Sequence, residues 1–380
     1  MEYEYQKNQR YFAQAANSLE EMTAEEFLEL GADDARAIYR GISFTAHKSA
    51  LYRILYESRL ASRIIAPLFS FSCHSEKYLY QMAAKINWSD FITLDQAFAI
   101  NTNVADSNIK HSLYASQVMK DAIVDQFREK TGERPNYNQK QPDVRFSLHI
   151  HRNFVNIGLD LSLTALHKRG YRVVGAVAPL QETLGAAIIR YSKWNGETPL
   201  VDPCCGSGTL LAEAMMHYCH IPAGYFRNFW GVTALPDYDE KLFKTVQSRA
   251  KEKIIPLPRG LISGSDISGM AADASRENLS RLPGGENVAI TKTDFRYHKS
   301  IENSTIVTNL PFGVRLGSSA ETVKLYNEFG DFLKHECKGS TAFVLVANKE
   351  IGGEIRLRTK RTRKMKNADL ESILLKLELY

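Results

Sequence analysis

Hydrophobic and polar positions alternate with two different periods in the N-terminal part of the chain. Runs of period two predict strands at residues 11–16 and 36–46, and a further strand at 64–73 with which the alternation begins again. Runs with helical spacing predict helices at residues 18–30 and 49–63. Short strands that exchange with helices in this way are typical of a small α+β unit.

The same alternation continues to about residue 160 and predicts a second small unit. Its expected elements are, in chain order, helix 76–86, strand 98–101, helix 112–130 and strands 144–151 and 154–161. We therefore predict two α+β domains in tandem, at residues 1–68 and 69–165.

The pattern changes after residue 165, where helices and short apolar strands follow each other in turn. The expected elements are helix 182–194, strand 200–201, a glycine-rich turn, helix 210–217, a proline-rich insertion at 221–260 and strand 261–267. Such alternation is typical of a parallel sheet with helices on both faces. Residues 166–380 are therefore predicted to form an α/β domain.

The glycine-rich turn has the sequence Asp-Pro-Cys-Cys-Gly-Ser-Gly-Thr at residues 202–209. Glycines allow such a turn to approach a ligand closely at the N-terminus of a helix. Leu211 occupies the place of the third glycine of a dinucleotide fingerprint, and the chain has no GxxxxGK[ST] phosphate loop. A pyrophosphate is therefore a poor candidate for the ligand.

Two acidic residues stand at the ends of later strands in this domain. Asp266 ends the strand at 261–267, where a carboxylate can accept both hydroxyls of a ribose. Asp294 has a similar place and suits an adenine amino group. Taken alone, each is more often a helix cap or a turn residue.

A polar turn at residues 309–313 follows a buried strand, and its residues suit a pocket for a planar amine. Asn309 Oδ1 and the carbonyl of Leu310 can accept both N–H bonds of an exocyclic NH2 group, which aims the nitrogen lone pair at an electrophile. Pro311 fixes the turn, and Phe312 can stack on the ring. The motif alone is an ordinary turn, but its order after the glycine turn and two acidic strand ends favours a site.

Basic residues are concentrated at 356–366, a segment with seven of them and no acidic residue. The whole chain carries a formal charge of +5, so the rest of the chain sums to about −2. A local patch for phosphates is one interpretation of this segment, and a solvated strand face is the other.

Composition places the chain among folded soluble proteins, with 44% hydrophobic and 24% charged residues. No secretory signal is visible, and no apolar run approaches the ~20 residues that cross a bilayer. Five cysteines, with Cys204 and Cys205 adjacent, suit neither a disulfide framework nor a zinc site. We therefore expect a reducing cytoplasm, no membrane and no metal.

Residues 178–313 resemble the S-adenosylmethionine-dependent amino-methyltransferases. Residues 178–183 stand where the family has its first cofactor-loop motif, and the glycine turn resembles its main cofactor motif. The sequence Asn-Leu-Pro-Phe resembles its N-P-P-Y catalytic motif, with Leu310 and Phe312 as departures. Position 310 would act through its carbonyl and position 312 through its ring face, so neither departure removes the proposed chemistry.

The upstream sequence makes the resemblance narrower. Residues 136–143, 159–162 and 166–172 look like the end of an RNA-binding THUMP domain, with Leu163 where glycine is usual. The whole chain is similar to the bacterial ribosomal RNA large-subunit methyltransferase L group, which makes N2-methylguanosine in 23S rRNA. The implied fold is α/β: a ferredoxin-like domain and a THUMP domain, followed by a Rossmann-like class I methyltransferase sheet.

The resemblance implies a role for each motif residue. S-adenosylmethionine would be bound by residues of the glycine turn, the strand ends and a helix start: Thr183, Asp202, Gly206, Gly208, Asp266 and Asp294. The target guanine would be received by Asn309, Leu310, Pro311 and Phe312. RNA phosphates would meet basic residues near both ends of the catalytic domain: Lys168, Arg169, Arg358, Lys360 and Arg361.

Three other functions fit parts of this pattern. A tRNA guanine-N2 methyltransferase would keep the chemistry and change the substrate. A DNA adenine-N6 methyltransferase would share the Asn309 motif, but it has no use for upstream RNA-binding domains. A noncatalytic RNA-binding or assembly factor would keep the fold, although intact Asp202, Gly206 and Gly208 argue against decay. The sequence makes no prediction of oligomeric state.

Overall fold

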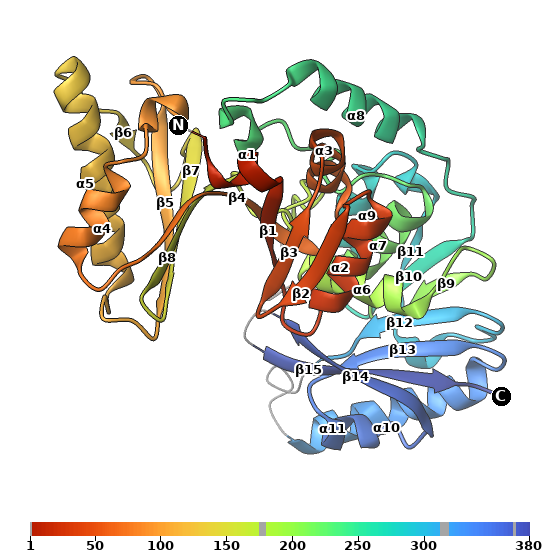
Figure 1. Ribbon diagram of the computed structural model, residues 1–380. Helices are drawn as coiled ribbons and strands as arrows, with labels where there is room; N and C mark the ends of the chain where they lie inside the picture. Colours follow the sequence, from red (N-terminus) through yellow and green to blue (C-terminus); the bar gives the residue numbers. More distant parts are fainter. Residues whose placement is uncertain (1, 175–179, 312–318, 368–369) are drawn as a thin grey trace. The chain divides into compact units, whose positions relative to one another are not determined.

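The computed structural model describes residues 2–174, 180–311, 319–367 and 370–380. Its chain forms two compact units, each built on a β-sheet (Figure 1). The first unit comprises Met1–Ala15, Thr23–Leu166 and Arg227–Gln247. The second comprises Ala16–Met22, His167–Phe226 and Ser248–Tyr380.

The first unit contains an eight-stranded sheet with the order β2-β3-β1-β4-β8-β7-β5-β6. The strands are β1 (Arg10–Ala15), β2 (Asp34–Ile38), β3 (Gly41–Thr45), β4 (Ala61–Ser72), β5 (Ala97–Ala105), β6 (Asn136–Tyr137), β7 (Val144–His151) and β8 (Phe154–Asp160). The helices in this part of the chain are α1 (Glu4–Asn8), α2 (Glu20–Glu29), α3 (Lys48–Glu57), α4 (Glu76–Ala83) and α5 (Ser112–Thr131).

Strand β4 joins the two α+β halves of this sheet. It has 12 residues and pairs antiparallel with β1 on one side and with β8 on the other. Ile64, Ala66 and Leu68 alternate along it and are buried, as the period of two requires. The predicted domain boundary after residue 68 falls inside this continuous strand, and the domain division stays a prediction.

Two elements of the first unit differ from the prediction. The strand predicted at 36–46 is a hairpin of β2 and β3, because the chain turns at Arg40 with a φ of 57°. The helix predicted at 49–63 ends at Glu57, because the residues from Ala61 onward form β4. A tight turn between adjacent strands decides the first case, and pairing of β4 with β1 and β8 decides the second; local periodicity shows neither.

Part of the predicted proline-rich insertion belongs to the first unit. Asp237 accepts a hydrogen bond from Tyr5 OH at 2.6 Å and forms an ion pair with Lys48 at 3.3 Å. The Phe243 ring packs edge-on against Tyr52, with their centroids 5.2 Å apart. Residues 227–247 therefore complete the core of a unit that is otherwise encoded upstream of them.

The second unit contains a seven-stranded sheet with the order β11-β10-β9-β12-β13-β15-β14. The strands are β9 (Leu200–Asp202), β10 (Ile262–Asp266), β11 (Ala289–Lys292), β12 (Thr305–Asn309), β13 (Thr341–Val346), β14 (Thr359–Asn367) and β15 (Leu370–Glu378). The helices in this part of the chain are α6 (Glu182–Ser192), α7 (Thr209–Tyr218), α9 (Gly269–Ser280), α10 (Ser319–Glu336) and α11 (Lys349–Gly353), and the division between the units falls inside α8 (Glu240–Glu252). Neighbouring strands from β11 to β13 are parallel, and β15 joins them antiparallel, which confirms the predicted fold class.

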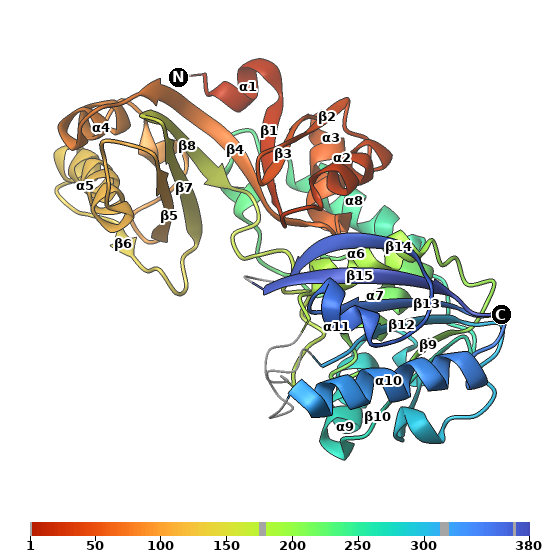
Figure 2. The same ribbon diagram turned by 90° about the horizontal axis from the view of Figure 1, so that it is seen from below.

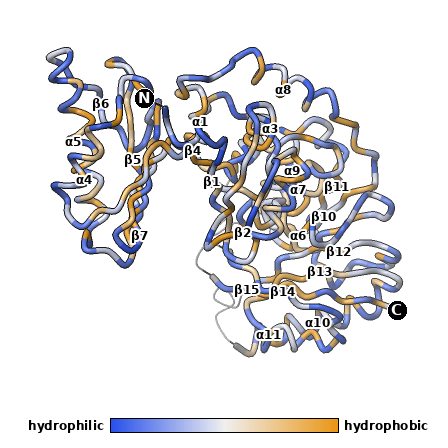
Figure 3. Tube along the Cα trace, in the orientation of Figure 1, coloured by the Kyte–Doolittle hydropathy of each residue, from blue (hydrophilic) through white to orange (hydrophobic). Residues whose placement is uncertain are grey.

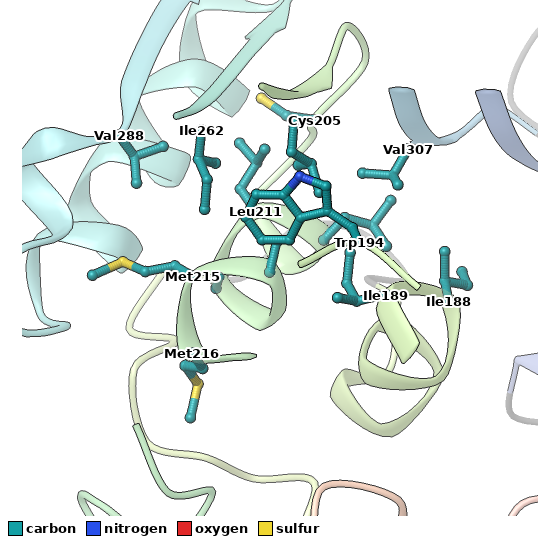
Figure 4. Close-up of a cluster of buried hydrophobic side chains, with 14 of the residues drawn as sticks. Ile188, Ile189, Trp194, Cys205, Leu211, Met215, Met216, Ile262, Val288 and Val307 are labelled. Atoms are coloured by element: carbon teal, nitrogen blue, oxygen red, sulfur yellow. The ribbon is translucent and has the colours of Figure 1, made fainter. Parts of the chain in front are cut away.

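Helices cover both faces of this sheet (Figure 2). Val307 and Phe343 face the core that contains α6 and α7, whereas their neighbours Ile306 and Val344 pack with residues of α10. Figure 4 shows the first of these cores around the Trp194 ring. Buried strand residues thus anchor the sheet from both sides, which fixes the ends of the strands.

Helix α8 lies in the segment where loops were predicted. Hydrophilic colours predominate along it in Figure 3, and its fully buried side chains are Phe243 and Ala250. Two buried positions seven residues apart give too weak a periodicity to predict a helix between proline-rich segments.

Candidate active site

Polar residues meet at the carboxyl ends of the central parallel strands of the second unit. β9 ends at Asp202, β10 at Asp266 and β12 at Asn309. β9 lies between β10 and β12, so the strand order reverses there. Open α/β sheets bind their ligands at this position. The structure therefore brings three of the predicted site residues to one edge of the sheet.

The glycine turn joins β9 to α7 through two glycines in the left-handed region. Gly206 has a φ of 55° and Gly208 a φ of 82°. A Cβ on Gly208 would lie 3.0 Å from Ser275 Oγ, whereas a Cβ on Gly206 would meet no described atom within 4 Å. The backbone at Gly206 therefore borders open space, as a turn that approaches a ligand requires.

Asp266 is tied to the glycine turn. Its Oδ2 accepts the N–H of Gly206 and its Oδ1 accepts the N–H of Ser268, each at 2.9 Å. The residue is partly exposed, and a carboxylate has about four lone-pair sites in all. Acceptor capacity therefore remains for the hydroxyls of a ligand.

Asp294 lies just beyond β11 as the N-cap of a short 3-10 helix. Its Oδ1 accepts the N–H of Arg296 at 3.0 Å, and its Oδ2 lies 3.2 Å from the guanidinium of the same residue. The structure thus shows the turn role, and a ligand amine would share this carboxylate with Arg296. The adenine role of Asp294 stays a prediction.

Asp202 is a buried carboxylate at the end of β9. It is 1% exposed, and its Oδ1 accepts the N–H of Cys204 at 3.1 Å. Burial raises the pKa of Asp202 to about 7, and the nearby Asp266 carboxylate adds to the rise. Within the described ranges, no basic side chain forms an ion pair with it. A cationic ligand would therefore stabilise its ionised form.

The side-chain oxygen of Asn309 is a buried hydrogen-bond acceptor. Its Oδ1 is shielded from solvent and has no hydrogen-bond partner among the described residues. An unmade hydrogen bond on a buried group costs about 1–3 kcal/mol, and Asn309 Oδ1 differs from the other such atoms of the described residues, Asn327 Oδ1 among them, in lying at the end of a central strand. The position of Oδ1 at the end of β12 suits an N–H group of a bound molecule.

The two residues after this asparagine are fixed by neighbouring elements. Leu310 donates its N–H to Leu345 O of β13 at 3.2 Å. Tyr326 OH of α10 donates to Pro311 O at 3.3 Å. Phe312, the predicted stacking residue, lies outside the described residues. The backbone that carries the Leu310 carbonyl is therefore held in place on both sides.

Thr183 is the second residue of α6 and is buried. A Cβ on Gly185, one residue beyond Leu184, would lie 3.3 Å from the side chain of Thr209. The first turn of α6 therefore packs against the first turn of α7, where the glycine turn ends. Of the first cofactor-loop motif, residues 178 and 179 lie outside the described residues.

The structure corrects one predicted RNA contact. Arg169 is 2% exposed, and its Nε lies 3.3 Å from Oε1 of Glu213, a residue that is also buried. A guanidinium that is buried against a carboxylate in the core cannot reach a phosphate. Lys168 beside it is exposed and keeps its predicted role as a proposal.

The basic segment forms the edge strand β14 and the residues just before it. Arg358, Lys360 and Arg361 are exposed there. Lys360 Nζ lies 3.0 Å from Glu378 Oε2 on β15, and this hydrogen bond raises the pKa of Lys360. The two interpretations of the segment, a basic patch and a strand face, therefore describe the same surface.

Sequence reasoning missed several polar groups that shape the site. Ser265 Oγ lies 2.6 Å from His298 Nε2 and 3.2 Å from Pro203 O, so it links β10 to the glycine turn. Arg172 donates a hydrogen bond to Ser207 of the same turn. Serine and histidine carry no motif signal here, and the resemblance at residues 166–172 implies no separate role for Arg172.

The expected S-adenosylmethionine fits these residues. Gly206 borders open space, Asp266 is partly exposed and Asp202 is a buried carboxylate that a cation would stabilise. Asn309 Oδ1 has no described partner and can accept an N–H group of a second molecule. The donor set therefore suits a cationic nucleoside beside an amine.

The described ranges show neither a metal-binding cluster nor a membrane-spanning helix. No three His, Cys, Asp or Glu side chains gather there in a way that could hold a metal ion. Nor does any helix in these ranges have the length and apolar character needed to span a membrane.

The chain matches three domain families in succession. Residues 169–376 match the RMKL-like methyltransferase domain, residues 73–160 the THUMP domain and residues 10–65 the RlmL ferredoxin-like domain. The chain therefore belongs to the RMKL-like methyltransferase family, as its resemblance predicted.

Relatives with names extend the match over nearly the whole chain. The ribosomal RNA large subunit methyltransferase K/L of Vibrio campbellii is 34% identical over 372 residues, which are 95% of this chain and 52% of the relative. The Synechocystis sp. protein slr0064, whose name describes an RNA methyltransferase, is 33% identical and covers 97% of both chains. This chain thus spans about half the length of the K/L relatives it matches.

Solved structures share the fold from end to end. A Clostridium difficile 630 protein, whose name proposes a methylase, has 27% identity and a TM-score of 0.85, with 98% of each chain covered. SMU.472, solved as a complex with SAH, has 24% identity, a TM-score of 0.86 and the same coverage. The second likeness shows the fold alone.

Proposed function

We propose that this chain uses S-adenosylmethionine to methylate the N2 atom of a guanine in RNA, with 23S rRNA as the favoured substrate. The observation that carries the proposal is the buried Oδ1 of Asn309 at the carboxyl edge of the sheet, which has no hydrogen-bond partner among the described residues. The THUMP match and the names of the ribosomal RNA methyltransferase relatives support RNA as the substrate class.

Recognition of the amine rests on two oxygen atoms. Asn309 Oδ1 and Leu310 O would each accept one N–H of the guanine amino group. Both N–H bonds are then used by the protein, so the nitrogen lone pair turns out of conjugation with the ring and toward the methyl group. The bonds that Leu345 O and Tyr326 OH make to this turn keep the two acceptors at a fixed separation.

The donor side rests on charge and position. Bound S-adenosylmethionine supplies a methyl group on a positively charged sulfur, which is already activated for displacement. Asp202 would lie toward the cationic end of the cofactor, Gly206 would allow close approach of the backbone, and Asp266 would accept the ribose hydroxyls. The chain therefore contributes orientation and electrostatics and has no need of a strong base.

RNA recognition must make the base accessible. A guanine N2 atom inside a duplex is out of reach, so the base lies in a loop or rotates out of its stack for about a few kcal/mol. Arg358, Lys360 and Arg361 on the edge of the sheet would offset this by contacts to phosphates. Charge on an edge strand also prevents pairing with another sheet, and the salt dependence of binding distinguishes the two roles.

The test replaces the proposed acceptor. Asn309→Ala should lower turnover by ~100-fold or more at nearly unchanged cofactor affinity, because the acceptor acts on the amine and not on the cofactor. Asn327→Ala is the matched control, since Asn327 Oδ1 is a second buried amide oxygen without a described partner, and it lies on α10. Transfer of a labelled methyl group to bulk RNA measures turnover, and calorimetric titration measures cofactor affinity.

The modified nucleoside identifies the substrate. Mass spectrometry of nucleosides from 23S rRNA and tRNA, with and without the gene, should show N2-methylguanosine missing from 23S rRNA. Loss of N2-methylguanosine from tRNA would instead identify tRNA as the substrate. Loss of N6-methyladenosine would show that the target base is adenine and not guanine. If the chain binds no S-adenosylmethionine, a noncatalytic role replaces the enzyme.

A further inference from the structure

Arg172 makes an unusually complete set of contacts with the segments that would surround the cofactor. Its Nε lies 3.0 Å from Glu182 Oε1, and its Nη2 donates to Leu180 O at 3.2 Å. Its Nη1 donates to Ser207 Oγ at 3.0 Å, and its Nη2 also donates to Thr209 Oγ1 at 2.9 Å. One planar guanidinium thus joins the start of α6 to the glycine turn.

These contacts fall where the turn has least freedom. Ser207 and Thr209 flank Gly208, whose φ of 82° lies in the left-handed region and where an added Cβ would lie 3.0 Å from Ser275 Oγ, so only glycine fits there without strain. Glu182 precedes Thr183, a predicted cofactor residue. The Arg172 guanidinium therefore fixes the distance between the glycine turn and the start of α6, the two segments that the cofactor would contact.

The segment that carries Arg172 is itself held in register. Asn278 of α9 accepts the N–H groups of Val173 at 2.9 Å and Val174 at 3.1 Å through its Oδ1. Its Nδ2 donates to Val174 O and to Ser207 O, each at 3.1 Å. Asn278 is 1% exposed, so this second link is buried as well. The turn at Ser207 is thus tied to residues 172–174 by two independent side chains.

We infer that Arg172 is a positioning residue for S-adenosylmethionine binding, which aligns the glycine turn with the first turn of α6. The inference rests on the proposed cofactor and is independent of the RNA that is methylated. Arginine is required because its planar fork addresses a carboxylate, a carbonyl and two hydroxyls at once. A lysine can keep the Glu182 ion pair but cannot hold the hydroxyls on both sides of Gly208.

The experiment measures cofactor affinity of the full chain without RNA. Arg172→Lys should weaken S-adenosylmethionine binding about tenfold or more by calorimetric titration, since the aligned turn is lost while charge is kept. Turnover at saturating cofactor should change far less, because Asn309 and Leu310 are untouched. Arg276→Lys is the matched control: this surface arginine of α9 donates to Ile290 O and should change affinity less than twofold.

A double-mutant cycle separates positioning from general stabilisation. Ser207→Ala removes one contact of the fork, so the losses in affinity from Arg172→Lys and Ser207→Ala should be far from additive in the double variant. Additive losses, or an affinity of Arg172→Lys within twofold of the wild type despite a lower Tm, would overturn the inference. If the wild-type chain itself fails to bind the cofactor, the proposed function fails instead, and the two failures are distinct.

Discussion

Replacing Asp202 with asparagine should stabilise the cofactor-free protein at pH 8 and weaken its binding of S-adenosylmethionine. The buried carboxylate has no described cation beside it, so its ionised form is unfavourable until a cationic ligand binds. An amide has nearly the same shape and keeps the acceptor for the Cys204 N–H, which the carboxylate bonds at 3.1 Å. The substitution therefore removes the charge and exchanges one carboxylate oxygen for an NH2 group, from which the Thr308 side chain, a donor to the carboxylate, would have to accept.

The sign of the effect follows from proton binding. Burial raises the pKa of Asp202 from 3.8 to about 7, so between these values the folded protein keeps a proton that the unfolded chain has lost. The free energy of unfolding therefore falls as pH rises through this window and stays low above it. A shift of roughly three pKa units corresponds to about 4 kcal/mol, which is the upper limit of the gain at pH 8. For a unit of about 200 residues, this limit corresponds to a rise in Tm of roughly 10 °C.

Scanning calorimetry and cofactor titration at several pH values test both halves of the prediction. Asp202→Asn should raise the Tm of the second unit most at pH 8 and clearly less at pH 5, because at pH 5 only part of the window between 3.8 and about 7 has been passed. Wild-type affinity for S-adenosylmethionine should fall about tenfold for each pH unit below 7, because binding then releases a proton. The affinity of the variant should be weaker at pH 8 and lack this dependence.

Glu213 provides a contrast of opposite sign. It is equally buried but is paired with Arg169 at 3.3 Å, so Glu213→Gln should lower the Tm by leaving a buried guanidinium without its partner. Equal Tm values for the wild type and Asp202→Asn at pH 8, or an equal shift at pH 5 and pH 8, would refute the argument from ionisation. A cofactor affinity that does not vary with pH in the wild type would refute the pairing with a cation.

Two further predictions concern RNA binding and the catalytic turn. Changing Arg358, Lys360 and Arg361 together to alanine should weaken RNA binding and flatten the dependence of log Kd on log salt, and an unchanged slope would exclude this strand as a phosphate contact. Tyr326→Phe should lower turnover ~10-fold at unchanged cofactor affinity, because a carbonyl of the catalytic turn loses its donor. Tyr171→Phe removes a buried hydroxyl without a described partner and should leave turnover unchanged, so similar losses in both variants would contradict a specific role for Tyr326.

The elements that positioned the site were predictable because parallel strands place their carboxyl ends together. Asp202, Asp266 and Asn309 could therefore be assigned to one edge from their order along the chain. The burial of Arg169 could not be predicted, because its partner Glu213 lies on a different element and only the fold brings the two together. Polar groups that act through other residues could not be predicted either, because no spacing in the sequence marks them.

The membership of residues 227–247 in the first unit has a consequence for how the chain is made. A ribosome releases the chain from its N-terminus onward, so the upstream core waits for Phe243 and Asp237 to emerge before it can close around Tyr52 and Tyr5. By then β9 and the glycine turn, which precede α7, have already left the ribosome. A separate fragment of residues 1–166 would lack Phe243 and Asp237. Its core would stay incomplete, and the exposed aromatic side chains would promote aggregation.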